Sequence, residues 1–337
     1  MNKCLYLNKE HQLFFVDNPI PVLGPKEVLV KIMSNGICGS DIHFYTEGRL
    51  GNFVIGDEPY VPGHEASGIV VAVGSEVANS HEGDRVVIEP GVPCGECELC
   101  REGRYNICSN LKFLSVPGIN GTLCEYIAVP SNMVHIMPDE MTFEQGALVE
   151  PLSVASHAVN RAGNAKGKTA AIIGAGPIGL FLLQAFKASG GGKAIMLDIM
   201  DGRLEIAKKL GADEVINTLK DGMPQNIANI VFETAGAVIT TAAMPSIVKK
   251  GGIMVQVGHP PRPVELDVEE MQQKELTFLA SLDYAGEFPT SILWLSDGRV
   301  NGEAMITSRF SFDKADEAFK YSATHRDITI KTIINNE

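Results

Sequence analysis

Hydrophobic and polar residues alternate in short runs over the first 150 residues, and Gly- and Pro-containing turns separate the runs. Alternation with a period of two is typical of a half-buried β-strand, and Val and Ile, which favour strands, dominate here. The clearest runs are EVLVKIM at 27–33, SGIVVAV at 67–73 and RVVIEP at 85–90. No long segment with the 3.6-residue period of a helix competes with them. We therefore predict a β-rich first part of the chain.

The pattern changes near residue 153, where SVASHAVNRAG (153–163) has a helical period and ends on a glycine suited to a helix C-terminus. Beyond it, short apolar runs alternate with helical stretches expected near 178–188, 202–210 and 240–250. The apolar runs are KTAAIIG, KAIMLDIM, IVFETAG, GGIMVQVGH and LTFLASLDY. Strands that alternate with helices indicate a parallel, doubly wound sheet.

The chain is expected to form two domains, because 337 residues exceed one ordinary core. From about residue 289 the pattern is mixed again, and it ends in an expected strand at 327–335. We therefore predict an α/β fold in which residues 154–288 form the parallel-sheet domain. Residues 1–153 and a return segment, 289–337, would together form the β-rich domain.

Composition and charge narrow the class of protein. Forty-five per cent hydrophobic and 20% charged residues are typical of a globular enzyme or binding protein. The net charge of −13 argues against nucleic-acid binding, which uses clustered Lys and Arg. No apolar run reaches the roughly 18 residues of a membrane span, and the first residues lack the apolar core of a signal peptide. We expect a cytoplasmic protein without a membrane or nucleic-acid partner.

A G-x-G-x-x-G motif, Gly174-Ala-Gly176-Pro177-Ile178-Gly179, follows the apolar run at 169–173 and opens an expected helix. Such a motif is weak evidence alone, but a strand before it and a helix after it are typical of dinucleotide binding. The glycines allow a tight turn, a close approach of the pyrophosphate, and packing of helix on strand. The helix N-terminus would offer N–H groups to the phosphates.

Asp198 ends the next apolar run, about twenty residues beyond the last glycine, where a carboxylate accepts hydrogen bonds from the adenosine ribose. It would repel a 2′-phosphate, which favours NAD over NADP. A polar residue that merely ends a strand is the other interpretation. Arg203 lies nearby and could bind a phosphate, although we expect it at the adenine or the ribose.

Three residues could bind a catalytic metal: Cys38 in NGICGSDIHFY, and His64 and Glu65 in VPGHEASGIV. Glu150, in ALVEPLSV, directly precedes the α/β segment. A thiolate, an imidazole and a carboxylate suit zinc with one coordination position open. A buried thiol, a turn histidine and a surface carboxylate are the alternative interpretations, because the spacing forms no local motif.

Four cysteines lie in the loop CGECELCREGRYNIC, with spacing C-x2-C-x2-C-x7-C. A disulfide cluster, a redox centre, an iron–sulfur cluster and zinc are all conceivable. The gap before the last cysteine does not fit a ferredoxin motif, and a redox pair would begin a helix after a strand. A zinc site closed by Cys94, Cys97, Cys100 and Cys108 fits best. Cys4 and Cys124 have no partner that the sequence identifies.

The chain resembles the zinc-containing medium-chain dehydrogenase/reductase superfamily, and within it the sorbitol (polyol) dehydrogenase branch. The matching stretches are CGSDIHFY, EGRLGNF, PGHEASGIV, GDRVVIEPG, GRYN, ALVEPLSV, GAGPIGL and SRFSFDKADEAF. The resemblance implies a GroES-like catalytic domain with a structural-zinc lobe at 90–110, divided in sequence by a Rossmann domain. It also implies a homotetramer or homodimer.

The resemblance assigns roles residue by residue. Cys38, His64 and Glu65 match ligands of the catalytic zinc, and Glu150 matches a carboxylate near the metal, the substrate and the catalytic step. Ser40 and His43 match a proton relay, and the loop cysteines match the structural zinc ligands. Cofactor contacts match, besides the glycine motif, Asp198, Arg203, Val257, Gly258, Ser281, Leu282 and Asp283. Phe44 and Tyr284 match substrate-side positions.

Two departures from the sorbitol pattern concern the substrate. Asp283 stands where an Arg is usual, and Phe44 stands where a Tyr is usual. The expected activity is therefore NAD-dependent oxidation of a secondary alcohol, a polyol, to a ketone with two zinc ions per chain. The alternatives are 2,3-butanediol, L-threonine or a sugar-phosphate alcohol as the substrate, and a non-catalytic NAD-binding scaffold.

Overall fold

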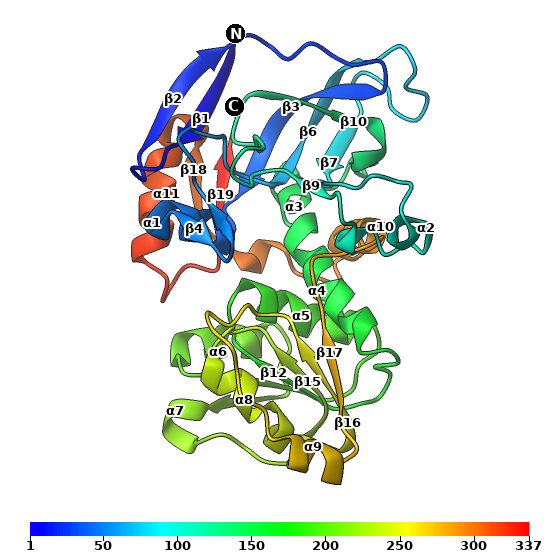
Figure 1. The fold of residues 1–337 in the computed structure, drawn as a ribbon, viewed down its shortest axis with the longest axis vertical. Coiled ribbons are helices and arrows are strands. Elements are labelled where there is room, and N and C mark those ends of the chain that lie inside the picture. The colour runs from blue at the N-terminus through cyan, green and yellow to red at the C-terminus, as the bar shows by residue number, and fades with distance from the viewer. Residues whose placement is uncertain (337) are drawn as a thin grey trace. The chain divides into compact units, whose positions relative to one another are not determined.

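The structure is a computed structural model and describes residues 1–336. Its contacts divide the chain into two compact units (Figure 1). Unit 1 contains Met1–Glu150, Phe288–Ser296 and the described residues from Ile306 onward, and unit 2 contains Pro151–Glu287 and Asp297–Met305. The last of these segments was assigned to the return segment of the β-rich domain in the sequence analysis. By its contacts it belongs to unit 2.

Unit 1 is built on a seven-stranded sheet in the order β11-β7-β6-β3-β19-β18, with β10 also paired to β3. Its strands are β3 (Glu27–Gly36), β6 (Glu65–Val73), β7 (Arg85–Ile88), β10 (Tyr126–Pro130), β11 (Val134–Ile136), β18 (Ile306–Ser311) and β19 (Lys331–Asn335). All pairs are antiparallel except β18 with β19, which α11 (Ala315–Thr324) connects. A parallel pair needs such a crossover, because a tight turn can join only antiparallel strands.

Smaller elements complete unit 1. Three two-stranded sheets are formed by β1 (Asn2–Leu7) with β2 (Leu13–Asn18), β4 (Arg49–Leu50) with β5 (Phe53–Val54), and β8 (Gly91–Val92) with β9 (Lys112–Phe113). The helices are α1 (Gly39–Glu47), α2 (Glu98–Arg101), α3 (Phe143–Ala147) and α10 (Phe288–Ser296), with 3-10 turns at Tyr105–Ile107, Ser131–Met133 and Phe312–Lys314. One buried cluster, which includes Val30 and Ile32 of β3 and Ile334 of β19, forms the main core.

Unit 2 contains a six-stranded parallel sheet in the order β14-β13-β12-β15-β16-β17. Numbered within the unit, this order is 3-2-1-4-5-6, the arrangement of the dinucleotide-binding Rossmann fold. The strands are β12 (Ala170–Ile173), β13 (Ala194–Asp198), β14 (Glu214–Asn217), β15 (Ala228–Glu233), β16 (Val248–Gln256) and β17 (Thr277–Ala280). The fold class is therefore the predicted one: an α/β chain with a β-rich unit and a doubly wound parallel-sheet unit.

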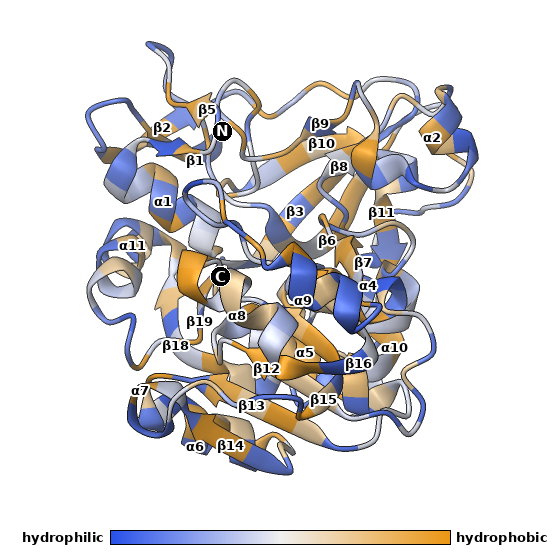
Figure 2. Cartoon of the chain, turned by 60° about the horizontal axis from the view of Figure 1, so that its bottom comes forward, coloured by the Kyte–Doolittle hydropathy of each residue, from blue (hydrophilic) through white to orange (hydrophobic). Residues whose placement is uncertain are grey.

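The helices of unit 2 are α5 (Pro177–Ala188), α6 (Asp201–Lys209), α7 (Thr218–Asp221), α8 (Val238–Ile247) and α9 (Val268–Gln273), with a 3-10 turn at Glu303–Met305. α4 (Val149–Arg161) begins with the last two residues of unit 1. The strands β12 and β13 are buried and apolar, as the orange of Figure 2 shows. The helix expected over 240–250 was wrong at its end, because residues 248–250 already belong to β16. Val248 pairs with Ala228 of β15, so the strand already begins at this residue.

None of the helices among residues 1–336 combines the length and the hydropathy that crossing a membrane requires.

Candidate metal and cofactor sites

The glycine motif of unit 2 lies between β12 and α5, and each glycine has a distinct steric reason. Gly174 has φ +102°, a conformation that residues with a side chain rarely adopt. A Cβ atom on Gly179 would lie 1.8 Å from the carbonyl oxygen of Gly174, so α5 can approach β12 only without one. Pro177 is the first residue of α5, where its missing N–H costs no hydrogen bond.

Gly176 differs from these two glycines, because a Cβ atom there would meet nothing closer than Arg203 Nη1 at 4.0 Å. Gly176 is the N-cap of α5, where the first N–H groups have no partner within the helix. Open space before a helix N-terminus suits a phosphate group. The motif therefore fits a dinucleotide, and Arg203 lies beside the same space.

Asp198 ends β13 and receives two backbone hydrogen bonds. Its Oδ2 accepts from Ala175 N at 2.6 Å, inside the glycine motif, and its Oδ1 accepts from Met200 N at 2.8 Å. The carboxylate is partly exposed. It connects the glycine turn to the end of the neighbouring strand, which is the position from which a carboxylate reaches an adenosine ribose.

Glu233, at the end of β15, is a functional candidate that the sequence analysis missed. The side chain is fully buried, yet it accepts hydrogen bonds from Thr240 Oγ1 and Gln256 Nε2, both at 2.7 Å, and from two backbone N–H groups. These donors take the place of water around the carboxylate. The motif IVFETAG contains this glutamate, but nothing in its local pattern separates it from a surface charge.

Val257 and Gly258 follow β16, and both of their backbone N–H groups donate to Glu233 O at 2.9 Å. A Cβ on Gly258 would lie 2.3 Å from Gly236 N, so the two loops need a glycine here. Glu233 and its carbonyl thus organise the loops at the carboxyl ends of β15 and β16. Dinucleotides bind at this edge of a doubly wound sheet.

The segment after β17 carries three of the expected cofactor residues, Ser281, Leu282 and Asp283. The Oγ atom of Ser281 is buried and has no hydrogen-bond partner among the described residues, and Asp283 has φ +46°. Tyr284 is 2% exposed. A buried hydroxyl without a protein partner is costly unless another molecule supplies one, so this segment also fits a bound cofactor.

In unit 1, the donor atoms of Cys38, His64 and Glu65 all lie within 4.8 Å of one another. Cys38 is the N-cap of α1, and His64 and Glu65 lie at the start of β6. β3 brings the two segments together, because it ends beside Cys38 and pairs with β6 at Gly36 and Glu65. The set is compact and largely buried, and its thiol, imidazole and carboxylate fit zinc.

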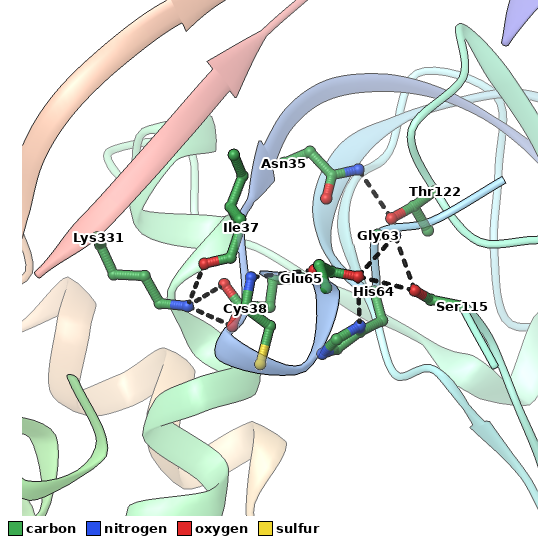
Figure 3. Close-up of polar contacts among 10 residues, drawn as sticks. Asn35, Ile37, Cys38, Gly63, His64, Glu65, Ser115, Thr122 and Lys331 are labelled. Carbon is green, nitrogen blue, oxygen red and sulfur yellow. Dashed lines mark hydrogen bonds and ion pairs between the residues drawn. The ribbon is translucent and has the colours of Figure 1, made fainter. Parts of the chain in front are cut away.

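Lys331 is a second residue that the sequence analysis missed. Its Nζ atom donates to both carboxylate oxygens of Glu65 and, at 3.1 Å, to Ile37 O (Figure 3). Both side chains of the pair are nearly inaccessible, at 3% and 0% exposure. Burial opposes the charge on Lys331, but Glu65, Cys38 and Glu150 outweigh it and raise the pKa of Lys331. The ammonium therefore neutralises Glu65 inside the unit.

Asp41 faces the other side of the metal candidates. Its Oδ1 accepts from Ser115 Oγ at 2.9 Å and from Gly63 N at 3.2 Å, and it lies 3.8 Å from His64 Nδ1. Burial works against a charged His64, whereas Asp41, Cys38 and Glu150 favour it, and together they raise the pKa of His64. Asp41 thus lies beside the imidazole at ion-pair distance and favours its charge, although His64 Nδ1 has no hydrogen-bond partner among the described residues.

Four further predicted residues occupy different surroundings. Glu150 is buried and acts electrostatically on His64. Ser40 and His43 lie on α1, and His43 Nδ1 lies 2.8 Å from Glu47 Oε1. Phe44, on the same helix, packs in a hydrophobic cluster with Tyr60. Its expected contact with substrate stays a prediction, as do the relay roles of Ser40 and His43.

The four loop cysteines converge on one point. The sulfur–sulfur distances are 3.4 Å for Cys97–Cys100, 3.5 Å for Cys94–Cys108, and 3.9 Å for Cys94–Cys100 and Cys97–Cys108. Four sulfurs around one zinc at about 2.3 Å would be separated by roughly 3.8 Å. The loop therefore has the dimensions of a closed tetrahedral zinc site.

Backbone N–H groups favour negative charge on the sulfurs of Cys94 and Cys108. Hydrogen bonds from Glu96 and Cys97 lower the pKa of Cys94 to about 6. Cys94 N and Asn110 N each lie 3.4 Å from Cys108 Sγ. Thiolates are the form that binds metal, so this backbone arrangement suits zinc.

Two family models match the chain. One, described as the alcohol dehydrogenase GroES-like domain, covers residues 24–139, and the other, described as a zinc-binding dehydrogenase, covers residues 177–297. The first contains Cys38, His64, Glu65 and the cysteine loop. The second begins at Pro177, within the glycine motif.

Full-length relatives agree with these models. The chain is 37% identical to a sorbitol dehydrogenase of Bacillus subtilis (strain 168), over 98% of this chain and 96% of the relative. It is also 37% identical to a D-xylulose reductase of Saccharomyces cerevisiae, over 98% and 97%. A solved structure, an oxidoreductase/dehydrogenase of unknown specificity from Escherichia coli, superposes with a TM-score of 0.94 at 36% identity, over 100% and 99% of the two chains.

Proposed function

This chain belongs to the zinc-dependent medium-chain dehydrogenases, in their polyol dehydrogenase branch, and from that premise we propose that it oxidises a polyol to a ketose with NAD. The hydride would leave a secondary carbinol of a sorbitol-, xylitol- or arabitol-type substrate. The observation that carries the proposal is the buried set of Cys38, His64 and Glu65 in a chain that aligns with polyol enzymes over nearly its whole length.

In the proposed reaction the chain supplies the ligands of the metal, a route for the substrate proton, and a carboxylate near the reacting oxygen. Zinc bound by Cys38, His64 and Glu65 would act as a Lewis acid on the substrate hydroxyl, and NAD would accept the hydride. Ser40 would accept the hydroxyl proton and give its own proton to the Nε2 atom of His43. The Nδ1 atom of His43, 2.8 Å from Glu47 Oε1, would in turn release a proton to that carboxylate. Glu150 would lie near the reacting oxygen and help to orient the substrate.

The glycine motif and Asp198 support NAD as the preferred cofactor. The pyrophosphate would lie before Gly176, in the open space at the N-terminus of α5. Asp198 would accept from the ribose hydroxyls and repel a 2′-phosphate. Ser281 would direct its buried Oγ atom to the cofactor. Arg203, beside Gly176, would contact the adenine end.

We test the function by a metal count together with a substrate panel. Purified protein is assayed for zinc and for NADH formation from sorbitol, xylitol, arabitol, galactitol, 2,3-butanediol and threonine. Two zinc ions per chain and polyol-dependent NADH are expected. Turnover of 2,3-butanediol or threonine alone would contradict the polyol assignment, and no turnover of any alcohol would contradict the enzyme itself.

Cys38→Ser tests the catalytic metal set. We expect loss of turnover by at least about 1000-fold, because a metal ligand is removed, while NAD binding followed by fluorescence stays near normal. Cys4→Ser is the matched control, since Cys4 is a buried cysteine outside the donor set. It should keep turnover. Retained activity in Cys38→Ser would remove this cysteine from the metal site.

The cellular setting is part of the proposal. A homotetramer or homodimer in the cytoplasm fits the family, and light scattering on the purified protein tests the assembly. A monomer at the concentrations that give full activity would contradict it.

A further inference from the structure

Cys4 and Cys124, for which the sequence offered no partner, lie opposite each other in an antiparallel β-bridge. Both side chains are 4% exposed and belong to the same hydrophobic cluster of unit 1. The bridge joins β1 to the segment that precedes β10. The fold thus pairs two cysteines that lie 120 positions apart in the sequence, which is why the sequence identified no partner for either.

The hydrogen bonds that flank the bridge define its type. Leu5 N donates to Leu123 O at 2.9 Å, and Glu125 N donates to Lys3 O at 3.0 Å. The bonds come from the neighbours of the cysteines, which makes the cysteines a non-hydrogen-bonded pair. In such a pair the Cα atoms are about 4.5 Å apart, and both side chains point to the same side. This separation lies within the range of about 4.4–6.8 Å that a disulfide spans.

The two thiols also influence each other's ionisation. The neighbouring Cys124 lowers the pKa of Cys4 against the effect of burial, whereas Cys4 and burial together raise the pKa of Cys124. The Cys124 thiol additionally lies 3.3 Å from Tyr126 O. Cys4 is thus the thiol that ionises first, with Cys124 directly beside it.

We propose that Cys4 and Cys124 form a disulfide when the folded protein meets hydrogen peroxide, and that this pair is a redox modification site distinct from both zinc sets. Among the described residues, the other five cysteines lie in the two donor sets of the metal candidates. Cys4 and Cys124 are therefore the two cysteines that neither metal set would use.

The chemistry needs one equivalent of peroxide. The Cys4 thiolate attacks a peroxide oxygen, the O–O bond breaks, and hydroxide leaves and takes up a proton to become water. The Cys4 sulfenic acid then reacts with the Cys124 sulfur, so that the S–S bond forms, the S–O bond breaks, and a second water leaves. Two thiols are oxidised and one peroxide is reduced. A dithiol reductant reverses the step by exchange.

The bond would fasten the β1–β2 hairpin, which pairs with the rest of unit 1 through two isolated bridges, Cys4 with Cys124 and Leu7 with Tyr60. It would also immobilise a segment that borders the catalytic set. Thr122 N donates to Gly63 O at 2.8 Å, directly before His64. Oxidation is therefore expected to stabilise unit 1 while the donor set stays intact.

Peptide mapping tests the proposal on the zinc-loaded full chain. The folded protein is treated with low peroxide, its free thiols are alkylated, and it is digested with trypsin without reduction. Cys4 falls in peptide 4–9 and Cys124 in peptide 113–161, and neither peptide contains another cysteine. We expect a linked 4–9/113–161 species that dithiothreitol separates. Free alkylated Cys4 and Cys124, at a dose that oxidises the other cysteines, would overturn the proposal, and so would a link that forms only in urea.

Melting curves provide the second readout. The oxidised protein should melt roughly 3–8 °C higher than the reduced protein, because the cross-link closes a long loop. Cys4→Ser and Cys124→Ser should show no such shift after the same treatment, and both should retain turnover before it. An oxidised wild-type protein that carries the linked peptides but melts unchanged would overturn the stabilising role.

Discussion

Single residues decide the chemistry of this chain, and sequence reasoning found those that are close together in recognisable stretches. Cys38, His64 and Glu65 were named from the sequence, and the fold brings their donor atoms together. Lys331 could not be found in this way, because 266 positions separate it from Glu65. Its stretch, DITIKTIIN, looks like an ordinary strand with one lysine. Only the pairing of β19 with β3 shows that the lysine is inside.

Lys331→Met should destabilise the zinc-free protein strongly, by about 3 kcal/mol, because it leaves the buried Glu65 carboxylate without its counter-ion. Bound zinc would supply the missing positive charge, so the loss should be smaller with zinc present. It follows that zinc should bind the variant more tightly than it binds the wild type. Melting curves with and without zinc, and a chelator competition, measure both effects.

Lys331→Arg is the matched control, since it keeps the charge and should behave close to wild type. Weaker zinc binding in Lys331→Met would show instead that the lysine holds Glu65 in the orientation that binds metal.

Asp198→Ala should weaken NAD binding by roughly 10-fold or more and relax the preference against NADP, because the ribose loses a charged acceptor. The glycine turn also loses the hydrogen bond at Ala175, which Asp198→Asn would partly keep. Binding constants for both cofactors measure the effect. An unchanged NAD-to-NADP ratio in both variants would exclude Asp198 from the cofactor site.

At the scale of elements, alternation and short apolar runs predicted the strands well. A strand with one buried face has an alternating sequence, and a strand with two buried faces has a continuous apolar sequence. The end of α8 was missed because local propensity does not show where β16 begins to pair with β15. The zinc site of the cysteine loop was predicted from its spacing and from the family resemblance. All four ligands of that site lie within residues 94–108, so the local sequence was sufficient to identify them.

Removal of metal with a strong chelator should loosen the cysteine loop first among the elements of unit 1. α2 and the 3-10 turn after it are short, and none of the residues of α2 is buried, so the core holds α2 only weakly. Hydrogen exchange should increase over residues 94–108 and much less over β3 and β6. Equal exchange in both regions would indicate that the loop is stable without metal.

Glu287 anchors the end of the segment that carries Ser281 and Tyr284. Its carboxylate accepts from His157 Nδ1 at 2.9 Å, Asn160 Nδ2 at 3.1 Å and Ala285 N at 2.6 Å. Burial opposes the carboxylate, but these partners prevail and lower the pKa of Glu287 below its usual 4.5.

The lowered pKa gives a pH-dependent prediction. A carboxylate whose folded pKa is lower stabilises the fold above its unfolded pKa, and this stability is lost as pH falls through the folded value. Wild type should therefore melt above Glu287→Gln at pH 7, and the gap should close as the pH falls below about 4.5. Melting curves of both proteins from pH 7 down to about pH 3 measure it. A gap that persists or widens at low pH would contradict this role.

At the scale of the whole molecule, the pattern changes near residue 153 and returns near 289, and the contacts of the fold change units at Pro151 and at Phe288. The pattern differs between the units because the strands of a parallel sheet are short, continuous apolar runs joined by helical crossovers. The sequence did not show to which unit residues 297–305 belong. This short segment has no period of its own, and contacts such as Asn301 N to Gln184 Oε1, at 2.7 Å, assign it to unit 2.

Unit 1 has a consequence for how the protein is made. One side of β3 is shared: β10 pairs with residues 27–31, and β19 pairs with residues 34–36. A ribosome releases β3 early, then all of unit 2, and β19 only afterwards. Unit 2 can therefore complete its sheet while residues 34–36 of β3 pair with β6 but still lack β19 on their other side. Lys331 arrives on that late strand. Until translation reaches Lys331, the Glu65 carboxylate lacks its counter-ion. The set of Cys38, His64 and Glu65 therefore carries more negative charge, and attracts zinc more strongly, in the nascent chain than in the finished protein.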